Sequence, residues 1–337
     1  WSPSDLLRMY IRKDVASQIW EYGVEPTPAA PKIDPYAGNT LSLDPVKVIN
    51  IAGTLSFSAP RGLAAAPDGS LFVADSRNHR IVHLDASGLY LNSWGSYANV
   101  LEGPAPEGLF NEPWGVAVGP DGLVYVTDTW NHRVQVFSPD GKFLRMWSEF
   151  LVDGVLDSFW GPRGIAVDAQ SHVYVTDTGK QRVVVFDTLG NYLTQFGSRG
   201  LVVGQLDEPV GIAVDSAGKV YVADTWNNRV QVFSPNEEGT LFTSVLTWDV
   251  DAWTTDSLDN KPFLALGADN EVFITDPDLG RVIRFDNQGA FLQLWGGYQN
   301  NFLMGVVSGI AVAQDGNVWV SDALNNTLLQ FAPPAVP

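Results

Sequence analysis

The chain of 337 residues contains no cysteine, which excludes disulfides, thiolate metal sites and cysteine nucleophiles. It has no run of about 18 apolar residues, so no segment within it is predicted to span a membrane. Basic residues number 20 against 38 acidic ones, and the net charge of −18 repels the phosphates of nucleic acids. We therefore expect no nucleic-acid partner. A hydrophobic content of 45% indicates a globular protein rather than a disordered one.

Several motifs of enzymes are also missing. The chain has no G-x-S-x-G, no glycine-rich phosphate loop and no H-E-x-x-H. It begins with Trp1, so we expect it to have been cleaved or cut from a longer chain. The absence of cysteine, the low lysine content and the 12 tryptophans favour a bacterial domain outside the cytoplasm.

The chain does contain a repeat, present in six copies 46 to 53 residues apart. Two of them read VYVTDTWNHRVQVF (124–137) and VYVADTWNNRVQVF (220–233). Each copy is aligned on an aspartate: Asp75, Asp128, Asp177, Asp224, Asp276 and Asp322. In the first five copies an arginine follows five residues later: Arg80, Arg133, Arg182, Arg229 and Arg281. The sixth copy has Thr327 at that place.

Each copy reads as four short strands of alternating apolar residues, bounded by turns rich in Gly, Pro, Asn and Asp. Four strands in a period of 40–50 residues indicate one blade of a β-propeller. The sixth copy ends at Phe331 and lacks a fourth strand, whereas an extra strand, Val46–Ile51, precedes the first copy. We therefore predict an all-β, six-bladed propeller in which Val46–Ile51 completes blade six and removes an open sheet edge.

These copies resemble the NHL-repeat propeller family, whose namesake Asn-His pair occurs as Asn78-His79 and Asn131-His132. The resemblance covers residues 46–331 and implies the six-bladed fold. It does not fix the function, because this fold hosts binders, scaffolds and enzymes.

The repeated Asp and Arg residues are interpreted as ion pairs that fix the turn between strands two and three, since the arginine fork matches a carboxylate. His79 and His132 belong to the same turn, and we expect them to form hydrogen bonds rather than bind metal. His83 and His172 are the other two histidines. A lyase of this fold would need histidines that converge on the channel, and the positions of these four argue against that.

Candidate binding residues are those that vary on the constant frame of the repeat. The fourth-to-first and second-to-third connections of every blade share one face, which we call the upper face. The residue before the repeat glycine is expected at the channel mouth, and a second variable residue lies in the second-to-third turn. These positions hold Arg61, Arg77, Trp114, Trp130, Arg163 and Trp226. Aromatic and arginine side chains together suit a glycan, a carboxylate or a partner protein, although the tryptophans could also simply cover loop edges.

The alternative is a metal-dependent propeller enzyme of the lactonase or lyase type. Such enzymes often hold a divalent ion with carboxylates and asparagines in the channel, but the inner strands here, such as VAVGP and IAVDA, offer few polar ligands. Calcium is a second possibility, in the acidic loop that contains Asp249, Asp251, Asp256 and Asp259. That loop lacks the glycine of an EF-hand, which favours a solvated loop. The preferred reading has no cofactor and no catalytic residue.

Residues 1–45 lie outside the repeats and are assigned to a separate N-terminal region, with the propeller at 46–337. Leu7, Ile11, Val15 and Ile19 recur at four-residue steps, which predicts an amphipathic helix over residues 5–21. Residues 25–45 are rich in proline and are expected to form an extended strap. The helix either packs on the propeller or joins it to a membrane protein. The second layout resembles the propeller tail of bacterial membrane glycosyltransferases, which implies a membrane-associated location.

Overall fold

The computed structural model describes residues 34–253, 259–297 and 302–334. The chain divides into two compact units, Trp1–Ala37 and Gly38–Pro337, and every described strand belongs to the second. The expected helix over residues 5–21 and the expected strap over residues 25–33 lie outside the described residues. Where the structure describes the chain, its helices are all too short to cross a bilayer.

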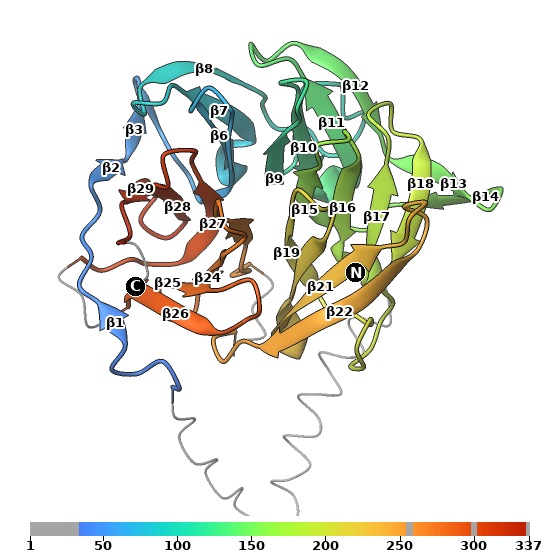
Figure 1. Ribbon diagram of the computed structural model, residues 1–337. Coiled ribbons are helices and arrows are strands. Elements are labelled where there is room, and N and C mark those ends of the chain that lie inside the picture. Colours follow the sequence, from blue (N-terminus) through green and yellow to red (C-terminus); the bar gives the residue numbers. More distant parts are fainter. Residues whose placement is uncertain (1–33, 254–258, 298–301, 335–337) are drawn as a thin grey trace, which may run out of the picture. The chain divides into compact units, whose positions relative to one another are not determined.

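The second unit is a ring of six antiparallel sheets, the blades of a propeller (Figure 1). Blade one comprises β5 (Pro60–Ala65), β6 (Leu71–Asp75), β7 (Arg80–Leu84) and β8 (Tyr90–Trp94). Blade two comprises β9 (Pro113–Val118), β10 (Val124–Asp128), β11 (Arg133–Phe137) and β12 (Phe143–Trp147). Blade three comprises β15 (Pro162–Val167), β16 (Val173–Asp177), β17 (Arg182–Phe186) and β18 (Tyr192–Phe196).

The remaining blades follow the same order, with the first strand innermost. Blade four comprises β19 (Pro209–Val214), β20 (Val220–Asp224), β21 (Arg229–Pro235) and β22 (Phe242–Asp249). Blade five comprises β23 (Leu264–Leu266), β24 (Val272–Asp276), β25 (Arg281–Phe285) and β26 (Phe291–Gly296). Blade six comprises β27 (Val307–Val312), β28 (Val318–Asp322), β29 (Thr327–Phe331) and a strand from the other end of the chain.

That strand is β2 (Lys47–Ile49), which pairs antiparallel with β29 and confirms the predicted closure. Val48 lies opposite Leu329, and the backbone N–H of Val46 donates to the carbonyl of Gln330 at 2.7 Å. In Figure 1 the blue strand β2 lies beside the red strands of blade six. A further strand, β1 (Thr40–Leu41), adds to β26 in parallel, within the region that the sequence analysis assigned to an irregular strap.

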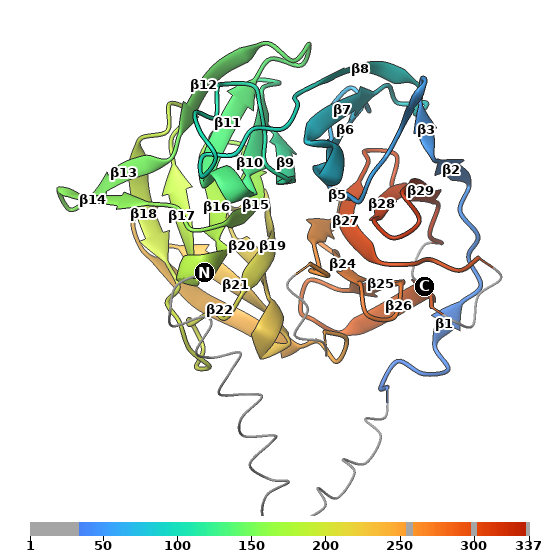
Figure 2. The same ribbon diagram turned by 180° about the vertical axis from the view of Figure 1, so that it is seen from behind.

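Two short hairpins extend the connections between blades. One joins β3 (Ile51–Ala52) to β4 (Leu55–Ser56), and the other joins β13 (Glu149–Val152) to β14 (Val155–Ser158). The β13–β14 hairpin stands out from the body of the propeller (Figure 2). It belongs to the connection from blade two to blade three, so it lies on the upper-face side of those blades.

A tight turn follows the second strand of each of the first four blades. It contains a single 3-10 turn: η1 (Ser76–Asn78), η2 (Thr129–Asn131), η3 (Thr178–Lys180) and η4 (Thr225–Asn227). The next residue has a left-handed backbone, with φ of 53° at His79 and at His132. The Nδ1 atom of His132 accepts a hydrogen bond from the backbone N–H of Gly161 at 3.0 Å, and His79 accepts one from Glu112 at 3.1 Å. Both histidines therefore link their turn to the approach of the next blade, as predicted.

The predicted ion pairs are present in the first five blades. In blade two the Nε atom of Arg133 lies 2.7 Å from Oδ2 of Asp128, and the carboxylate is fully buried. The corresponding pairs are Asp75–Arg80, Asp177–Arg182, Asp224–Arg229 and Asp276–Arg281. Burial raises the pKa of Asp177 to about 6, and the neighbouring Arg182 opposes that rise. The paired arginine thus keeps a desolvated carboxylate charged at neutral pH.

Hydroxyl groups next to these aspartates join neighbouring blades. Thr127 donates its hydroxyl to the carbonyl of Arg163 at 2.7 Å, and Ser321 of blade six donates to the carbonyl of Arg61 in blade one at 2.6 Å. The repeat glycines allow this close approach, because a Cβ at Gly309 would overlap the carbonyl of Arg61. Equivalent bonds from Thr176 and Thr275 fix the inner strands at two further junctions of the ring.

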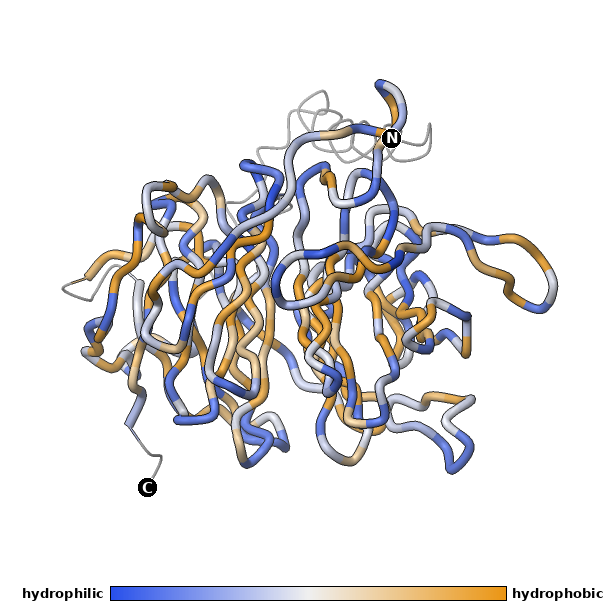
Figure 3. Tube along the Cα trace, turned by 90° about the horizontal axis from the view of Figure 1, so that it is seen from above, coloured by the Kyte–Doolittle hydropathy of each residue, from blue (hydrophilic) through white to orange (hydrophobic). Residues whose placement is uncertain are grey.

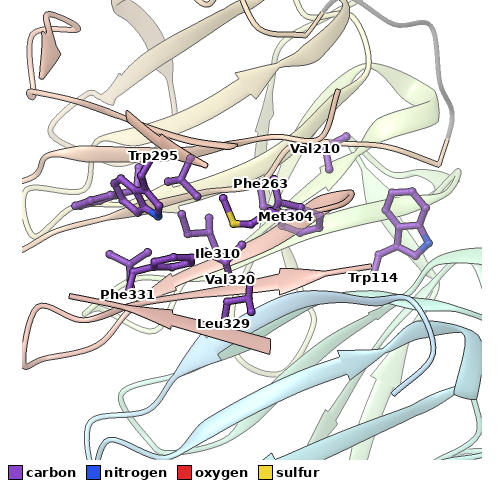
Figure 4. Packing of buried hydrophobic residues seen from close by; sticks show 13 residues of the cluster. Trp114, Val210, Phe263, Trp295, Met304, Ile310, Val320, Leu329 and Phe331 are labelled. Atoms are coloured by element: carbon purple, nitrogen blue, oxygen red, sulfur yellow. The ribbon is translucent and has the colours of Figure 1, made fainter. Parts of the chain in front are cut away.

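The apolar core lies between the blades rather than in a single centre. The hydrophobic residues follow the strands, whereas the connections are mostly hydrophilic (Figure 3). One buried cluster includes Trp114 of blade two, Val210 of blade four, Phe263 next to β23 and Val307 of blade six (Figure 4). The other three come from the consecutive blades four, five and six, whereas blade two neighbours none of these, so Trp114 reaches across the central channel.

Candidate functional site

The six candidate residues divide into an inner and an outer group. Arg77 and Trp130 lie exposed in the second-to-third turns of blades one and two, Trp130 with 37% of its surface accessible. Trp226 is half-buried at the same position of blade four. Arg61, Trp114 and Arg163, which the sequence analysis expected at the channel mouth, are 3%, 0% and 5% exposed. Their side chains are therefore packed among other residues rather than displayed to solvent.

Trp114 and the two inner arginines form a stack at the upper end of the channel. The guanidinium carbon of Arg61 lies 3.8 Å from the centre of the Trp114 ring, and that of Arg163 lies 4.5 Å from it. Cation–π contacts of this kind gain strength when they are shielded from water. We call these three side chains the channel stack. The sequence analysis grouped them by their position in the repeat, but it did not predict that they contact one another.

Charged neighbours surround the channel stack. Arg163 pairs with Glu208, whose Oε2 lies 2.8 Å from Nη1 of the arginine. Lys261 is fully buried, lies 3.5 Å from the same oxygen and contacts the ring of Trp226 at 4.6 Å. Arg61 donates to the carbonyl of Asp259, and burial lowers the pKa of Arg61 to about 10. The upper end of the channel thus holds three buried cations, of which Arg163 and Lys261 contact the buried carboxylate of Glu208.

The lower end of the channel is open. It contains a cavity of about 340 Å³, lined mainly by small and apolar residues: Ala65, Ala66, Pro67, Val118, Gly119, Pro120, Val167, Asp168, Ala169, Val312 and Gln314. The carboxylate of Asp168 already accepts hydrogen bonds from the ring of His172 at 2.9 Å and the hydroxyl of Tyr174 at 3.0 Å. The buried channel stack lies at the other end of the channel.

Three fourth-to-first connections present exposed aliphatic side chains on the upper-face side, which the sequence analysis missed. We call them the loop tips and define them by Leu101, Leu156 and Leu201, which are 85%, 63% and 76% exposed. Val155, Val202 and Val203 beside them are also exposed. The run Leu201–Val203 between two glycines was a signal that could have been noticed, because an apolar run in a predicted loop has no core to enter.

Each loop tip is held by the arginine of the ion pair in the following blade. Arg133 donates to the carbonyls of Ala105, Pro106 and Leu109 in the connection that carries Leu101. Arg229 donates to Val202 and Gln205 in the equivalent connection before blade four. Arg182 binds Asp157 at the base of the β13–β14 hairpin, at 2.7 Å. The loop tips are therefore displayed on well-anchored backbone rather than on free loops.

Metal ligands do not gather in the described part of the chain. Residues 34–253, 259–297 and 302–334 include no group of three or more His, Asp or Glu residues arranged to hold an ion. Of the acidic loop considered for calcium, Asp249 ends β22, Asp251 and Asp259 follow, and Asp256 lies outside the described residues.

Comparison with known proteins identifies the repeat. The NHL-repeat profile matches residues 57–84, 110–137, 159–186 and 206–233. The chain is 39% identical over 80 residues to NHL repeat-containing protein 2 of Gallus gallus, which covers 23% of this chain and 11% of that protein. The chain thus spans about a tenth of that relative's length. It contains NHL repeats and folds as a six-bladed β-propeller.

Two solved structures share the fold at low sequence identity. A gluconolactonase from Xanthomonas campestris has a TM-score of 0.61 with 14% identity, covering 85% of this chain and 88% of that one. A streptogramin B lyase has a TM-score of 0.55 with 15% identity, covering 85% and 96%. At such identities the similarity concerns the fold alone.

Proposed function

We propose that this propeller is a non-catalytic binding or scaffold module that engages a protein partner through its upper face. The observation that carries the proposal is the set of loop tips, three exposed aliphatic positions at the same connection of consecutive blades. Exposed apolar groups held on rigid backbone are typical of protein-binding surfaces, because little conformational entropy is lost on binding. Trp130 adds an exposed aromatic side chain on the same face.

The chemistry of the loop tips favours a protein over a glycan. Leucine and valine side chains gain free energy by burial against other apolar groups, whereas sugars need stacking aromatics and hydrogen bonds. Exposed acidic residues accompany the tips, among them Glu102 beside Leu101 and Asp153 beside Val155. With a net charge of −18 on the whole chain, the matching partner has an apolar patch bordered by lysine or arginine.

The enzyme alternative has less support. The gluconolactonase and the lyase share this fold, yet the upper end of the channel in this chain is filled by the channel stack. Cations at that place repel a divalent metal ion rather than bind one. The lower end offers small apolar walls and Asp168, whose carboxylate is already hydrogen-bonded. We therefore assign no catalytic residue.

The location outside the cytoplasm, in association with a membrane, is part of the same proposal. It is supported by the lack of cysteine and by the amphipathic pattern over residues 5–21. Fractionation of cells that produce this protein tests it, and recovery in the soluble cytoplasmic fraction would contradict it.

The test of partner binding compares two matched triple variants. The first replaces Leu101, Leu156 and Leu201 by serine. The control replaces Leu91, Leu144 and Leu193 by serine, which occupy one position on the outermost strands and are 52%, 40% and 43% exposed. Both variants should keep the wild-type melting temperature, because exposed positions contribute little to stability.

The readout is cross-linking and co-purification of partners from a membrane extract, followed by affinity measurement with the purified partner. We expect the loop-tip variant to bind at least tenfold more weakly, a loss of about 1.4 kcal/mol, and the control to bind normally. Equal binding by wild type and the loop-tip variant would refute the assignment. A glycan array run in parallel decides the glycan alternative, since a glycan retained by both variants would contradict the proposal of a protein partner.

A further inference from the structure

Four buried N–H groups at the upper end of the channel have no hydrogen-bond acceptor among the described residues. They are Nε of Arg61, Nε of Arg163, Nε1 of Trp114 and Nε1 of Trp226. The first three belong to the channel stack, and each of those side chains is at least 95% buried. An unsatisfied buried donor is costly, and several of them at one place indicate a missing acceptor.

The charges nearby point to an acceptor that carries negative charge. Arg61, Arg163 and Lys261 are buried cations, and Glu208 is the buried carboxylate that Arg163 and Lys261 share. Asp259, with its side chain 62% exposed, lies 4.0 Å from Arg61. Glu112 also attracts Arg61, whereas Arg77 repels it. Glu208 is thus engaged by two cations, and among the described residues the carboxylates that attract Arg61, those of Asp259 and Glu112, are partly solvated.

The frame that holds these donors is rigid. The backbone carbonyls of Arg61 and Arg163 accept hydrogen bonds from Ser321 and Thr127 of the preceding blades. Contact with the ring of Trp114 then helps to fix both guanidinium groups, whose carbons lie 3.8 and 4.5 Å from the ring centre. A site whose donors are held in place before binding loses little entropy when it binds.

From this arrangement we infer that the upper end of the channel binds a small carboxylate, which accepts hydrogen bonds from the channel stack. A carboxylate presents two oxygens to more than one donor, and its plane suits the fork of arginine. Glu208 already shows how this site receives a carboxylate, through Nη1 of Arg163. The exposed side chain of Asp259 marks the side from which the site meets solvent. This inference does not depend on the loop tips.

The direct test follows the indole N–H of Trp114 by ¹H–¹⁵N NMR in the whole chain. The signal is assigned by its loss in Trp114→Phe, and Trp295→Phe is the control, because Trp295 is equally buried with an unpaired Nε1 but lies on β26 of blade five, whereas Trp114 lies on β9 of blade two. Formate and acetate are titrated at constant ionic strength against chloride and inorganic phosphate. We expect the two carboxylates to move the Trp114 signal and raise Tm, and chloride and phosphate to do neither.

Affinity measurements complete the test. Trp114→Phe and Arg163→Gln should each bind acetate at least tenfold more weakly, while Trp295→Phe binds it like wild type. If either substitution unfolds the protein, the other one and the wild-type titration still decide.

The bound carboxylate could come from the C-terminus of a peptide chain or from a free metabolite. Short peptides with a free or an amidated C-terminus separate these two sources. A preference for the free C-terminus assigns the carboxylate to a chain end, and binding of acetate without binding of either peptide assigns it to a free metabolite. The inference fails if phosphate or chloride acts as strongly as acetate, or if no anion moves the signal, which would mean that water satisfies these donors.

Discussion

Replacing Arg133 by alanine should destabilise the protein more than the same change at any more exposed member of the repeated ion pairs. Arg133 has 5% of its side chain exposed and lies against the fully buried carboxylate of Asp128. It also donates to the carbonyls of Ala105, Pro106 and Leu109. Its removal leaves a buried charge without its cation and frees the connection that carries the first loop tip.

The expected loss follows from these contacts. Breaking a buried ion pair by removal of one partner costs about 3–5 kcal/mol. Arg80 provides the comparison, since its side chain is 15% exposed and it donates to one backbone carbonyl, that of Ser56. We expect Arg80→Ala to cost less, roughly 1–3 kcal/mol, which is the range for an unsatisfied buried hydrogen-bonding group.

Urea unfolding followed by tryptophan fluorescence measures both losses. The exposed Lys142→Ala serves as the control and should unfold like wild type. Adding Asp128→Asn to Arg133→Ala should recover part of the lost stability, because the uncompensated charge is then gone. The ion-pair argument is wrong if Arg133→Ala unfolds at the same urea concentration as wild type. It is also wrong if adding Asp128→Asn to Arg133→Ala lowers the free energy of unfolding further.

Two other predictions concern the ring and its pH dependence. Deleting Val46–Ile51 should expose the edge of β29 and cause aggregation or a large drop in Tm, and a monomeric deletion variant with unchanged melting would refute the closure argument. The contribution of Asp177 and Asp276 to the free energy of unfolding should grow as the pH falls from 7 to 5. It is opposed by His79, His83 and His132, because burial lowers the pKa of each of these histidines. Burial raises the pKa of Asp177 and of Asp276 to about 6, so the folded state binds more protons there, and this contribution is lost as pH rises through about 6. Below about pH 4 the trend should reverse, because the pKa of Asp157 is lowered by Arg182 and Lys180 despite desolvation. Urea titrations of wild type and of the Asp276→Asn variant from pH 3 to 8 check this, and an equal pH dependence of the two proteins between pH 7 and 5 would contradict it.

The sequence by itself determined the architecture. Alternating apolar residues predict strands, and six copies at a nearly constant spacing predict six blades, because each blade is a local structure within about 50 residues. The position of Val46–Ile51 in blade six was also predictable from the number of strands in each copy, since the sixth copy lacked a fourth strand. The pairing of Asp128 with Arg133 followed for the same reason, because five residues separate the two ends of one tight turn.

Only the tertiary structure decided what the variable residues do. Arg61, Trp114 and Arg163 come from three blades, and their contact depends on the width of a channel that no single repeat encodes. The same holds for Lys261 and Glu208, which meet at this site from connections before different blades. The loop tips were likewise hidden, since an exposed leucine and a buried one look alike in a sequence until the packing around them is known. Periodicity fixes the strands because it reflects local geometry, whereas the burial of a side chain depends on every blade around the ring.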